Sequence, residues 1–169
     1  MDATKINLVT KKQGMVENNT IGVGFGVMIL RNGKVLLGQR HMDPAKADSE
    51  LHGEWTRTMP WGKMHFHESF EDTCYRETLE ETGLNINKDT IKIISITNDI
   101  VPDKHFVTIG FLSEDVVGEA QVMEPDEITQ WKRFDLNDLP TPLFFPSEKV
   151  IKNYLAGTIY MRDAVKVWI

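Results

Sequence analysis

The sequence predicts one α+β or α/β sandwich domain, because its elements alternate as strands, helix, strands, helix. Two apolar runs with β-branched residues, 21–30 and 34–40, are joined by Asn32-Gly33, a dipeptide typical of tight hairpins. A helical segment with clear end signals follows at 70–82. The length of 169 residues fits a single domain with a sizeable core.

The first helix has recognisable start and stop signals. Ser69 followed by Asp72 resembles a capping box, and acidic residues near the start complement the positive end of the helix dipole. Gly83 suits the left-handed position after the last turn. We therefore predict a helix from about Phe70 to Thr82.

The remaining segments are assigned from composition and punctuation. The polar stretch 41–54 is expected to be a surface loop. A second helix is predicted from Ser147, acting as its cap, to Ala156. The other predicted parts are strands at 91–100, 105–112 and 128–136, a polar N-terminal arm at 1–20, a domain core at about 20–157 and a tail at 158–169.

Composition restricts the possible functions. A net charge of −6 argues against a broad surface for a nucleic acid polymer. Cys74 is the only cysteine, so no intramolecular disulfide can form and a reducing compartment is expected. The chain shows neither a signal-peptide pattern nor an apolar run long enough to span a membrane. We expect a cytoplasmic protein without a membrane partner.

Three glutamates share one face of the predicted first helix. Glu80 and Glu81 lie roughly 60° to one side and 40° to the other side of Glu77, given the helical period. Like charges at this spacing weaken a helix by a few tenths of a kcal/mol per pair, so they need another explanation. Either they form a solvated acidic face or they bind a hard cation, since Mg²⁺ and Mn²⁺ prefer carboxylate oxygens.

The stretch 62–84 resembles the signature of the Nudix hydrolases, and in general appearance the chain is similar to their MutT-related members. That signature is a Gly, five residues, a Glu, seven residues, Arg-Glu, an apolar residue, any residue, Glu-Glu, any residue, a Gly and an apolar residue. The positions in register are Gly62, Glu68, Arg76, Glu77, Glu80, Glu81, Gly83 and Leu84. Thr78, Trp61 and His67 depart from the usual pattern, which puts loop geometry, rate and substrate choice in question more than the chemistry.

The resemblance implies a Nudix fold, an α/β/α sandwich with a mixed sheet between helices. It also implies Mg²⁺ or Mn²⁺ as cofactor, held by Glu77, Glu80, Glu81 and a backbone carbonyl at Gly62 or Trp61. Glu77 and Glu81 are the strongest ligand candidates from their spacing alone, because they lie one turn apart. Glu77, Glu80 and Glu81 are the catalytic candidates.

Further site residues are expected around this helix. By resemblance, Arg76 and Glu68 form a structural pair that orients the helix. A downstream acid is expected to supply another metal ligand or the general base, and we prefer Glu127 to Glu124. Lys63 and Arg57 either contact phosphate or are ordinary solvated charges, and Phe144 and Phe145 either stack on a base or pack in the core.

The expected activity is metal-dependent hydrolysis of a nucleoside triphosphate, in a standard, modified or deoxy form, to a monophosphate and pyrophosphate. One alternative is hydrolysis of a nucleotide sugar or ADP-ribose. Another is a Nudix-fold module that binds a nucleotide without turning it over. A homodimer is a further expectation, with Val165–Ile169 as a candidate contact.

Overall fold

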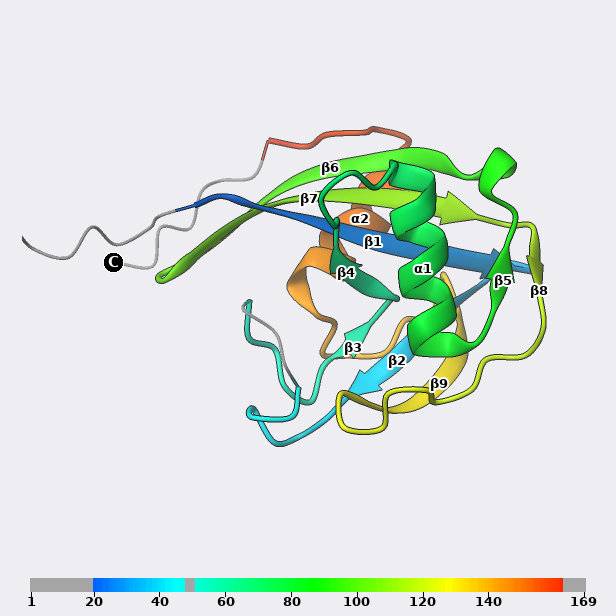
Figure 1. Ribbon diagram of the computed structural model, residues 1–169, viewed down its shortest axis with the longest axis horizontal. Coiled ribbons are helices and arrows are strands. Elements are labelled where there is room, and N and C mark those ends of the chain that lie inside the picture. The colour runs from blue at the N-terminus through cyan, green and yellow to red at the C-terminus, as the bar shows by residue number, and fades with distance from the viewer. Residues whose placement is uncertain (1–19, 48–50, 163–169) are drawn as a thin grey trace, which may run out of the picture.

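A mixed sheet lies between two helices in the computed structural model, which describes residues 20–47 and 51–162 (Figure 1). Helix α1 lies in front of the sheet and α2 lies behind it in the view of Figure 1. This arrangement confirms the predicted fold class. The elements are β1 (Gly22–Arg31), β2 (Lys34–Arg40), β3 (Arg57–Thr58), β4 (Trp61–Lys63), α1 (Phe70–Thr82), β5 (Asn85–Ile86), η1 (Lys88–Thr90), β6 (Lys92–Val101), β7 (Lys104–Ser113), β8 (Val116–Val117), β9 (Ile128–Asp135) and α2 (Phe145–Leu155).

Strand β1 is the centre of the sheet. It pairs in parallel with β7, where Phe25 lies opposite Ile109, and antiparallel with the short strand β4, where Phe25 lies opposite Gly62. Strand β6 continues the sheet beyond β7. After the β1–β2 hairpin, β2 leaves β1 and pairs with β9 and β3. The loop that leads into α1 therefore starts from a strand hydrogen-bonded to the centre of the sheet.

Helix α1 begins and ends at the predicted residues. The Ser69 hydroxyl accepts a hydrogen bond from the Asp72 amide, and Gly83 adopts the left-handed conformation with φ of 70°. The Gly83 amide donates to the Leu79 carbonyl at 2.9 Å. Local capping thus fixes both ends of the helix that carries the acidic residues.

Helix α2 begins earlier than predicted, so the assignment of Ser147 as its cap is wrong. The helix starts at Phe145, with Pro146 in its first turn and no side-chain cap at Phe144. Ser147 is buried inside the first turn, where its hydroxyl lies 3.1 Å from that of Thr58 and accepts from the Met59 amide. Ser147 therefore joins α2 to the segment between β3 and β4.

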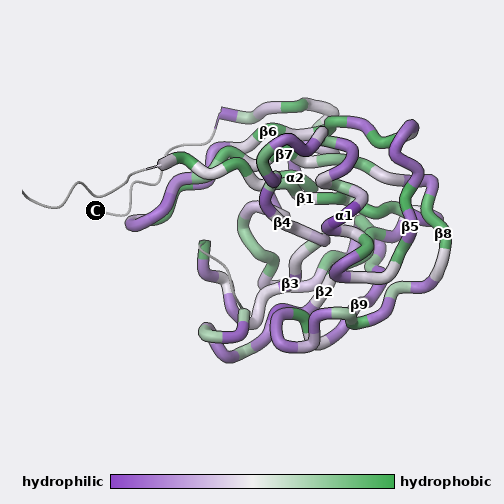
Figure 2. The backbone as a smooth tube through the Cα atoms, viewed as in Figure 1, coloured by the Kyte–Doolittle hydropathy of each residue, from purple (hydrophilic) through white to green (hydrophobic). Residues whose placement is uncertain are grey.

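The two faces of β1 supply two parts of the core. Phe25, Val27 and Ile29 pack toward α1, where Cys74 is buried among them. Met28 and Leu30 pack with residues of α2. Hydrophobic residues accordingly concentrate along the central strands (Figure 2). Burial raises the pKa of the Cys74 thiol, which makes it a packing residue rather than a nucleophile.

The start of the C-terminal tail lies along the edge of the sheet. The Ile96 amide of β6 donates to the Ile159 carbonyl at 2.8 Å, and the Asn153 side chain donates to the same carbonyl. The expected contact at Val165–Ile169 and most of the expected arm at 1–20 lie outside the described residues.

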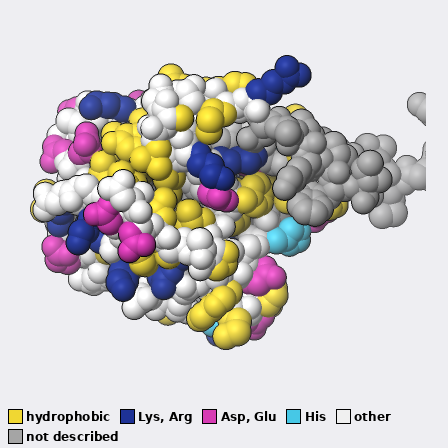
Figure 3. Space-filling view, turned by 180° about the vertical axis from the view of Figure 1, so that it is seen from behind, with side chains coloured by type: hydrophobic (Ala, Val, Ile, Leu, Met, Phe, Trp, Pro, Cys, Tyr) yellow, Lys and Arg dark blue, Asp and Glu magenta, His cyan; other side chains and the backbone are white. Residues whose placement is uncertain are grey.

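The surface of the described residues shows mixed chemistry. On the face behind Figure 1, basic side chains are scattered among acidic and hydrophobic ones (Figure 3). No helix within 20–47 and 51–162 is long and apolar enough to cross a membrane.

Candidate active site

The three glutamates of α1 differ in their exposure to solvent. The Glu77 side chain is 12% exposed and that of Glu80 is 50% exposed. Glu81 is buried, with 7% of its surface exposed. The acidic face of α1 is therefore not a uniformly solvated surface, which removes the simplest alternative to a binding site.

Gly62 and Glu77 are in direct contact. A Cβ atom at Gly62 would lie 1.8 Å from Glu77 Cδ and 2.0 and 2.1 Å from its two carboxylate oxygens. The carboxylate thus occupies the space that any other residue at position 62 would fill. Glycine is required here because the backbone of β4 supports the acidic side chain of α1.

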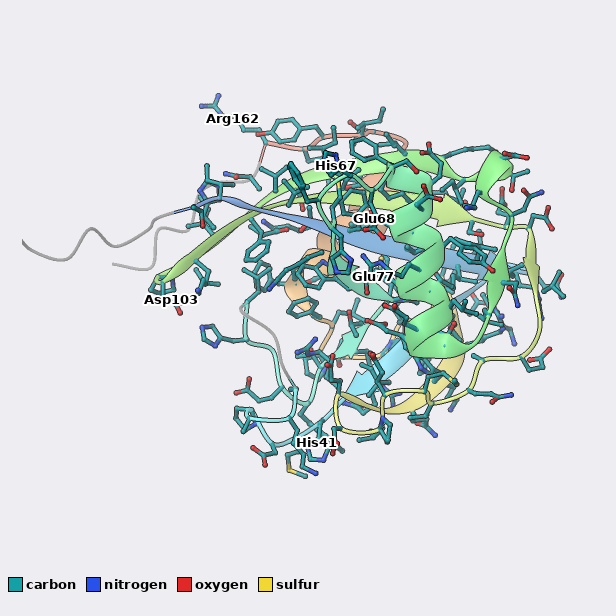
Figure 4. All side chains as sticks on the ribbon, viewed as in Figure 1. His41, His67, Glu68, Glu77, Asp103 and Arg162 are labelled. Carbon is teal, nitrogen blue, oxygen red and sulfur yellow. The ribbon has the colours of Figure 1, made fainter. Side chains whose placement is uncertain are left out.

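Arg76 connects the glutamates to the loop before the helix. Its Nε lies 2.6 Å from Glu68 and its Nη2 donates to Glu68 and to the Lys63 carbonyl, both at 2.9 Å. Its Nη1 donates to Glu77 at 2.7 Å and to Glu80 at 3.1 Å. Figure 4 shows Glu68 and Glu77 beside α1, on the side that faces β4.

Glu68 is held in its charged form by several donors. Besides Arg76, it accepts hydrogen bonds from the Thr73 hydroxyl and the His65 amide, each at 2.9 Å. The hydrogen bonds from Arg76 are the main reason that the pKa of Glu68 falls to about 2. The same contact raises the pKa of Arg76. This geometry supports the structural role predicted for the pair.

Glu81 is in the opposite electrostatic situation. Its two carboxylate oxygens each lie 3.4 Å from the Trp61 amide, at the long limit of a hydrogen bond. Burial, followed by repulsion from Glu77, raises the pKa of Glu81 well above its usual range. Burial also raises the pKa of Glu77, against the effect of Arg76. Both charged forms would be favoured by a nearby cation.

The loop between β8 and β9 brings a fourth acid to this cluster. Burial and repulsion from Glu80 raise the pKa of Glu124, and Glu124 in turn helps raise those of Glu77 and Glu81. Glu127 contributes to the raised pKa of Glu81, and its carbonyl accepts from the His41 amide at 2.7 Å. Both downstream acids therefore act on α1, and repulsion from Glu124 has a larger effect on Glu81 than repulsion from Glu127.

The acidic cluster suits a hard divalent cation by its chemistry. Its oxygens come from carboxylates whose charged forms are disfavoured by burial and by each other. Within 20–47 and 51–162, no three acidic, histidine or cysteine side chains already converge as a metal-binding group. Cation binding would therefore require side chains to turn, including Glu77, which now contacts Arg76.

The side chains of the two basic candidates, Lys63 and Arg57, lie beside aromatic rings. Lys63 Nζ lies 5.8 Å from the centre of the Phe106 ring. Because strand residues alternate, the Lys63 side chain projects from the face of β4 opposite to Gly62 and Glu77. Arg57 Cζ lies 5.3 Å from the centre of the Phe134 ring, and both Nη atoms of Arg57 lie 3.5 Å from Gln130 Oε1.

Phe144 cannot stack on a base in this structure, so that part of the aromatic prediction is wrong. Its ring is fully buried, with its centre 6.2 Å from that of a Trp61 ring and 4.8 Å from Arg40 Cζ. Phe145 is only partly buried and lies 5.6 Å from Lys149. A lone sequence could not distinguish these two neighbouring rings, because α2 begins between them.

The departures from the family signature have local explanations. The Trp61 indole lies over β1, where a Cβ at Gly24 would be 2.5 Å from Trp61 Cζ2. His67 adopts a φ of 70°, the left-handed conformation that favours glycine, which the family often has at this position. Thr78 is fully buried in the slot that is usually aliphatic. Helix α1 nevertheless begins and ends at the predicted residues.

Comparison with known proteins agrees with this geometry. Residues 20–154 match the NUDIX domain family. The ADP-ribose pyrophosphatase of Methanocaldococcus jannaschii is 31% identical over 128 residues, covering 76% of this chain and 69% of that protein. The NAD-capped RNA hydrolase NudC of Pseudomonas putida is 38% identical over 88 residues, covering 52% of this chain and 29% of that protein.

Solved structures give the same result. The MutT NUDIX hydrolase of Burkholderia pseudomallei has a TM-score of 0.70 at 27% identity, covering 79% of this chain and 98% of that one. The NUDIX domain of Shewanella oneidensis NrtR, solved with ADP ribose, has a TM-score of 0.64 at 19% identity, covering 81% and 88%, and shows the shared fold alone. The family match over residues 20–154 shows that the chain belongs to the Nudix family.

Proposed function

We propose that this Nudix hydrolase uses Mg²⁺ or Mn²⁺ to hydrolyse the diphosphate of a nucleoside diphosphate compound, with ADP-ribose as the leading candidate. The observation that carries the metal-dependent chemistry is the buried acidic cluster of α1, whose Glu77 carboxylate rests on Gly62. Such a cluster is destabilised by its own charges unless a cation binds.

Glu77, Glu81 and Glu124 would hold the cation, with Glu80, Glu127 and the Gly62 carbonyl as further ligands. When bound, a divalent metal neutralises phosphate charge and lowers the pKa of a coordinated water. Arg76 keeps Glu68 charged and fixes the loop before α1, so the pair positions the ligands without touching substrate. The general base is a carboxylate of this cluster, with Glu77, Glu80 and Glu124 as candidates.

ADP-ribose is favoured by the named activity of the Methanocaldococcus jannaschii relative, which is 31% identical over 128 residues. A nucleoside triphosphate remains the second candidate. It is supported by the MutT hydrolase of Burkholderia pseudomallei, which is matched over 98% of its length. The burial of Phe144 removes one of the two candidates for stacking on a base, and this affects both substrates equally because each carries a base.

The test is a substrate panel with Mg²⁺ in which the products are separated by chromatography. ADP-ribose should yield AMP and ribose 5-phosphate, whereas a triphosphate would yield monophosphate and pyrophosphate. Exclusive turnover of triphosphates would replace the leading substrate with the second one. Stoichiometric nucleotide binding without any product would identify a binding module instead.

The cluster itself is tested by Glu77→Gln and Glu81→Gln. Each should lower metal-dependent turnover by at least ~100-fold, because each removes a carboxylate on which the cation depends. Glu71→Gln is the matched control, since Glu71 is exposed on the first turn of the same helix. Full activity of either folded test variant would exclude that residue as a required ligand.

A further inference from the structure

The C-terminal turn of α1 needs hydrogen-bond donors from outside the helix. The last carbonyls of any α-helix have no partner within it, and α1 ends at Thr82 with Gly83 turning the chain away. Two of these carbonyls belong to Glu81 and Thr82. Groups that bind these carbonyls also fix the residue that carries the buried acid of the site.

Trp131 supplies one of these donors from β9. Its indole Nε1 donates to the Glu81 carbonyl at 3.1 Å. The Met123 amide lies 3.4 Å from the same carbonyl, and the Gln121 amide donates to Thr82 at 2.9 Å. The helix that holds the acids and the loop that leads to Glu124 are thus joined at one point.

The position of Trp131 is itself determined by the sheet. Trp131 lies opposite Gly38 in the β2–β9 pair, and a Cβ at Gly38 would be 2.8 Å from Trp131 Cζ3. The indole also packs against the core on the α1 side of the sheet. Its N–H is therefore held toward Glu81 by contacts that do not involve the active site.

We propose that Trp131 is a positioning residue that holds Glu81, and with it the metal site, in place. Within residues 20–47 and 51–162, the buried Glu81 carboxylate is bound by long contacts to the Trp61 amide. The hydrogen bonds that Trp131 and Met123 donate to the Glu81 backbone carbonyl are therefore a main constraint on the position of this residue. A shift of about 1 Å in such a group is enough to cost about 100-fold in rate. The inference rests on the proposed function, because it assumes that Glu81 binds the cation.

The experiment measures Mn²⁺ affinity by electron paramagnetic resonance in the wild type and in Trp131→Phe, which removes the N–H and retains an aromatic ring. Tyr75→Phe is the matched control, because it removes one aromatic hydrogen bond, from Tyr75 to Asn85 at 2.9 Å, on the same helix. Trp131→Phe should weaken Mn²⁺ binding about tenfold. Tyr75→Phe should leave it within twofold of the wild type.

A second variant separates the hydrogen bond from the packing. Benzothienylalanine at position 131 replaces the indole N–H with sulfur at nearly the same shape, and it should weaken Mn²⁺ binding to the same extent even if Trp131→Phe does not fold. Unchanged Mn²⁺ affinity in this variant would overturn the inference alone. A wild type that binds no Mn²⁺ would overturn the proposed function, and this inference with it.

Discussion

Replacing Gly62 with Ala tests the contact that organises the site. The new Cβ would lie 1.8–2.1 Å from the Glu77 carboxyl atoms, whereas ordinary van der Waals contact begins at 3.4 Å. The carboxylate must therefore retreat by more than about 1 Å, away from its 2.7 Å contact with Arg76. We expect metal-dependent turnover to fall by at least ~100-fold, since misplacement of ~1 Å has that effect.

The stability of Gly62→Ala has to be separated from its activity. Overpacking should cost about 1–3 kcal/mol. Gly157→Ala is the matched control: Gly157 has a φ of 64° and no neighbour within 4 Å of a new Cβ, so only backbone strain of ~1–2 kcal/mol is added. Thermal melts should show comparable losses, while steady-state kinetics should show lost activity only in Gly62→Ala. Activity of folded Gly62→Ala within twofold of the wild type would refute the reasoning.

Three further predictions concern the acids. Because the pKa of folded Glu81 is raised, the metal-free protein should gain stability as pH falls from that raised pKa toward ~4.3. Thermal melts in EDTA should show a smaller gain in Glu81→Gln than in the wild type. Equal gains would contradict a raised pKa of Glu81. Because the pKa of folded Glu68 is about 2, its stabilising effect is complete above ~4.3 and is lost as pH falls toward 2, so Glu68→Gln should lower the melting temperature at pH 7 by more than at pH 3. In steady-state kinetics, Glu124→Gln should lower turnover by more than ~10-fold and Glu127→Gln by less than ~3-fold, because Glu124 has the larger electrostatic effect on Glu81. The reverse order would make Glu127 the preferred downstream ligand.

Local signals predicted α1, whereas contacts formed far along the chain determined the elements that sequence reasoning missed. Ser69 and Gly83 act on neighbouring backbone groups, so the helix bounds could be read directly. The strands β3, β4, β5 and β8 have two or three residues each, which is too short for any periodic pattern. Their pairing with distant strands creates them.

The same distinction applies to the site. The spacing of Glu77, Glu80 and Glu81 predicted a shared face, because that depends only on the helical period. The sequence alone could not show the hydrogen bonds that hold the loop carrying Glu124 and Glu127, because these bonds join the loop to the distant end of α1. The preference for Glu127 over Glu124 was therefore made without them. The sequence treated Phe144 and Phe145 alike for a related reason, because α2 starts two residues earlier than predicted and Phe144, just before this start, lies in the core.

The site combines two opposite electrostatic environments, and Arg76 separates them. On the loop side, Arg76 stabilises the charge of Glu68, and this contact fixes the chain that enters α1. On the sheet side, burial opposes the charges of Glu77 and Glu81. Because Arg76 and other donors of the protein stabilise the charge of Glu68, this contact can hold the loop and helix in place while the charges of Glu77 and Glu81 remain unfavourable. A cation that binds here would relieve the repulsion between these carboxylates, and this relief would contribute to its binding free energy. Such a role explains why α1 carries acids whose mutual repulsion weakens the helix.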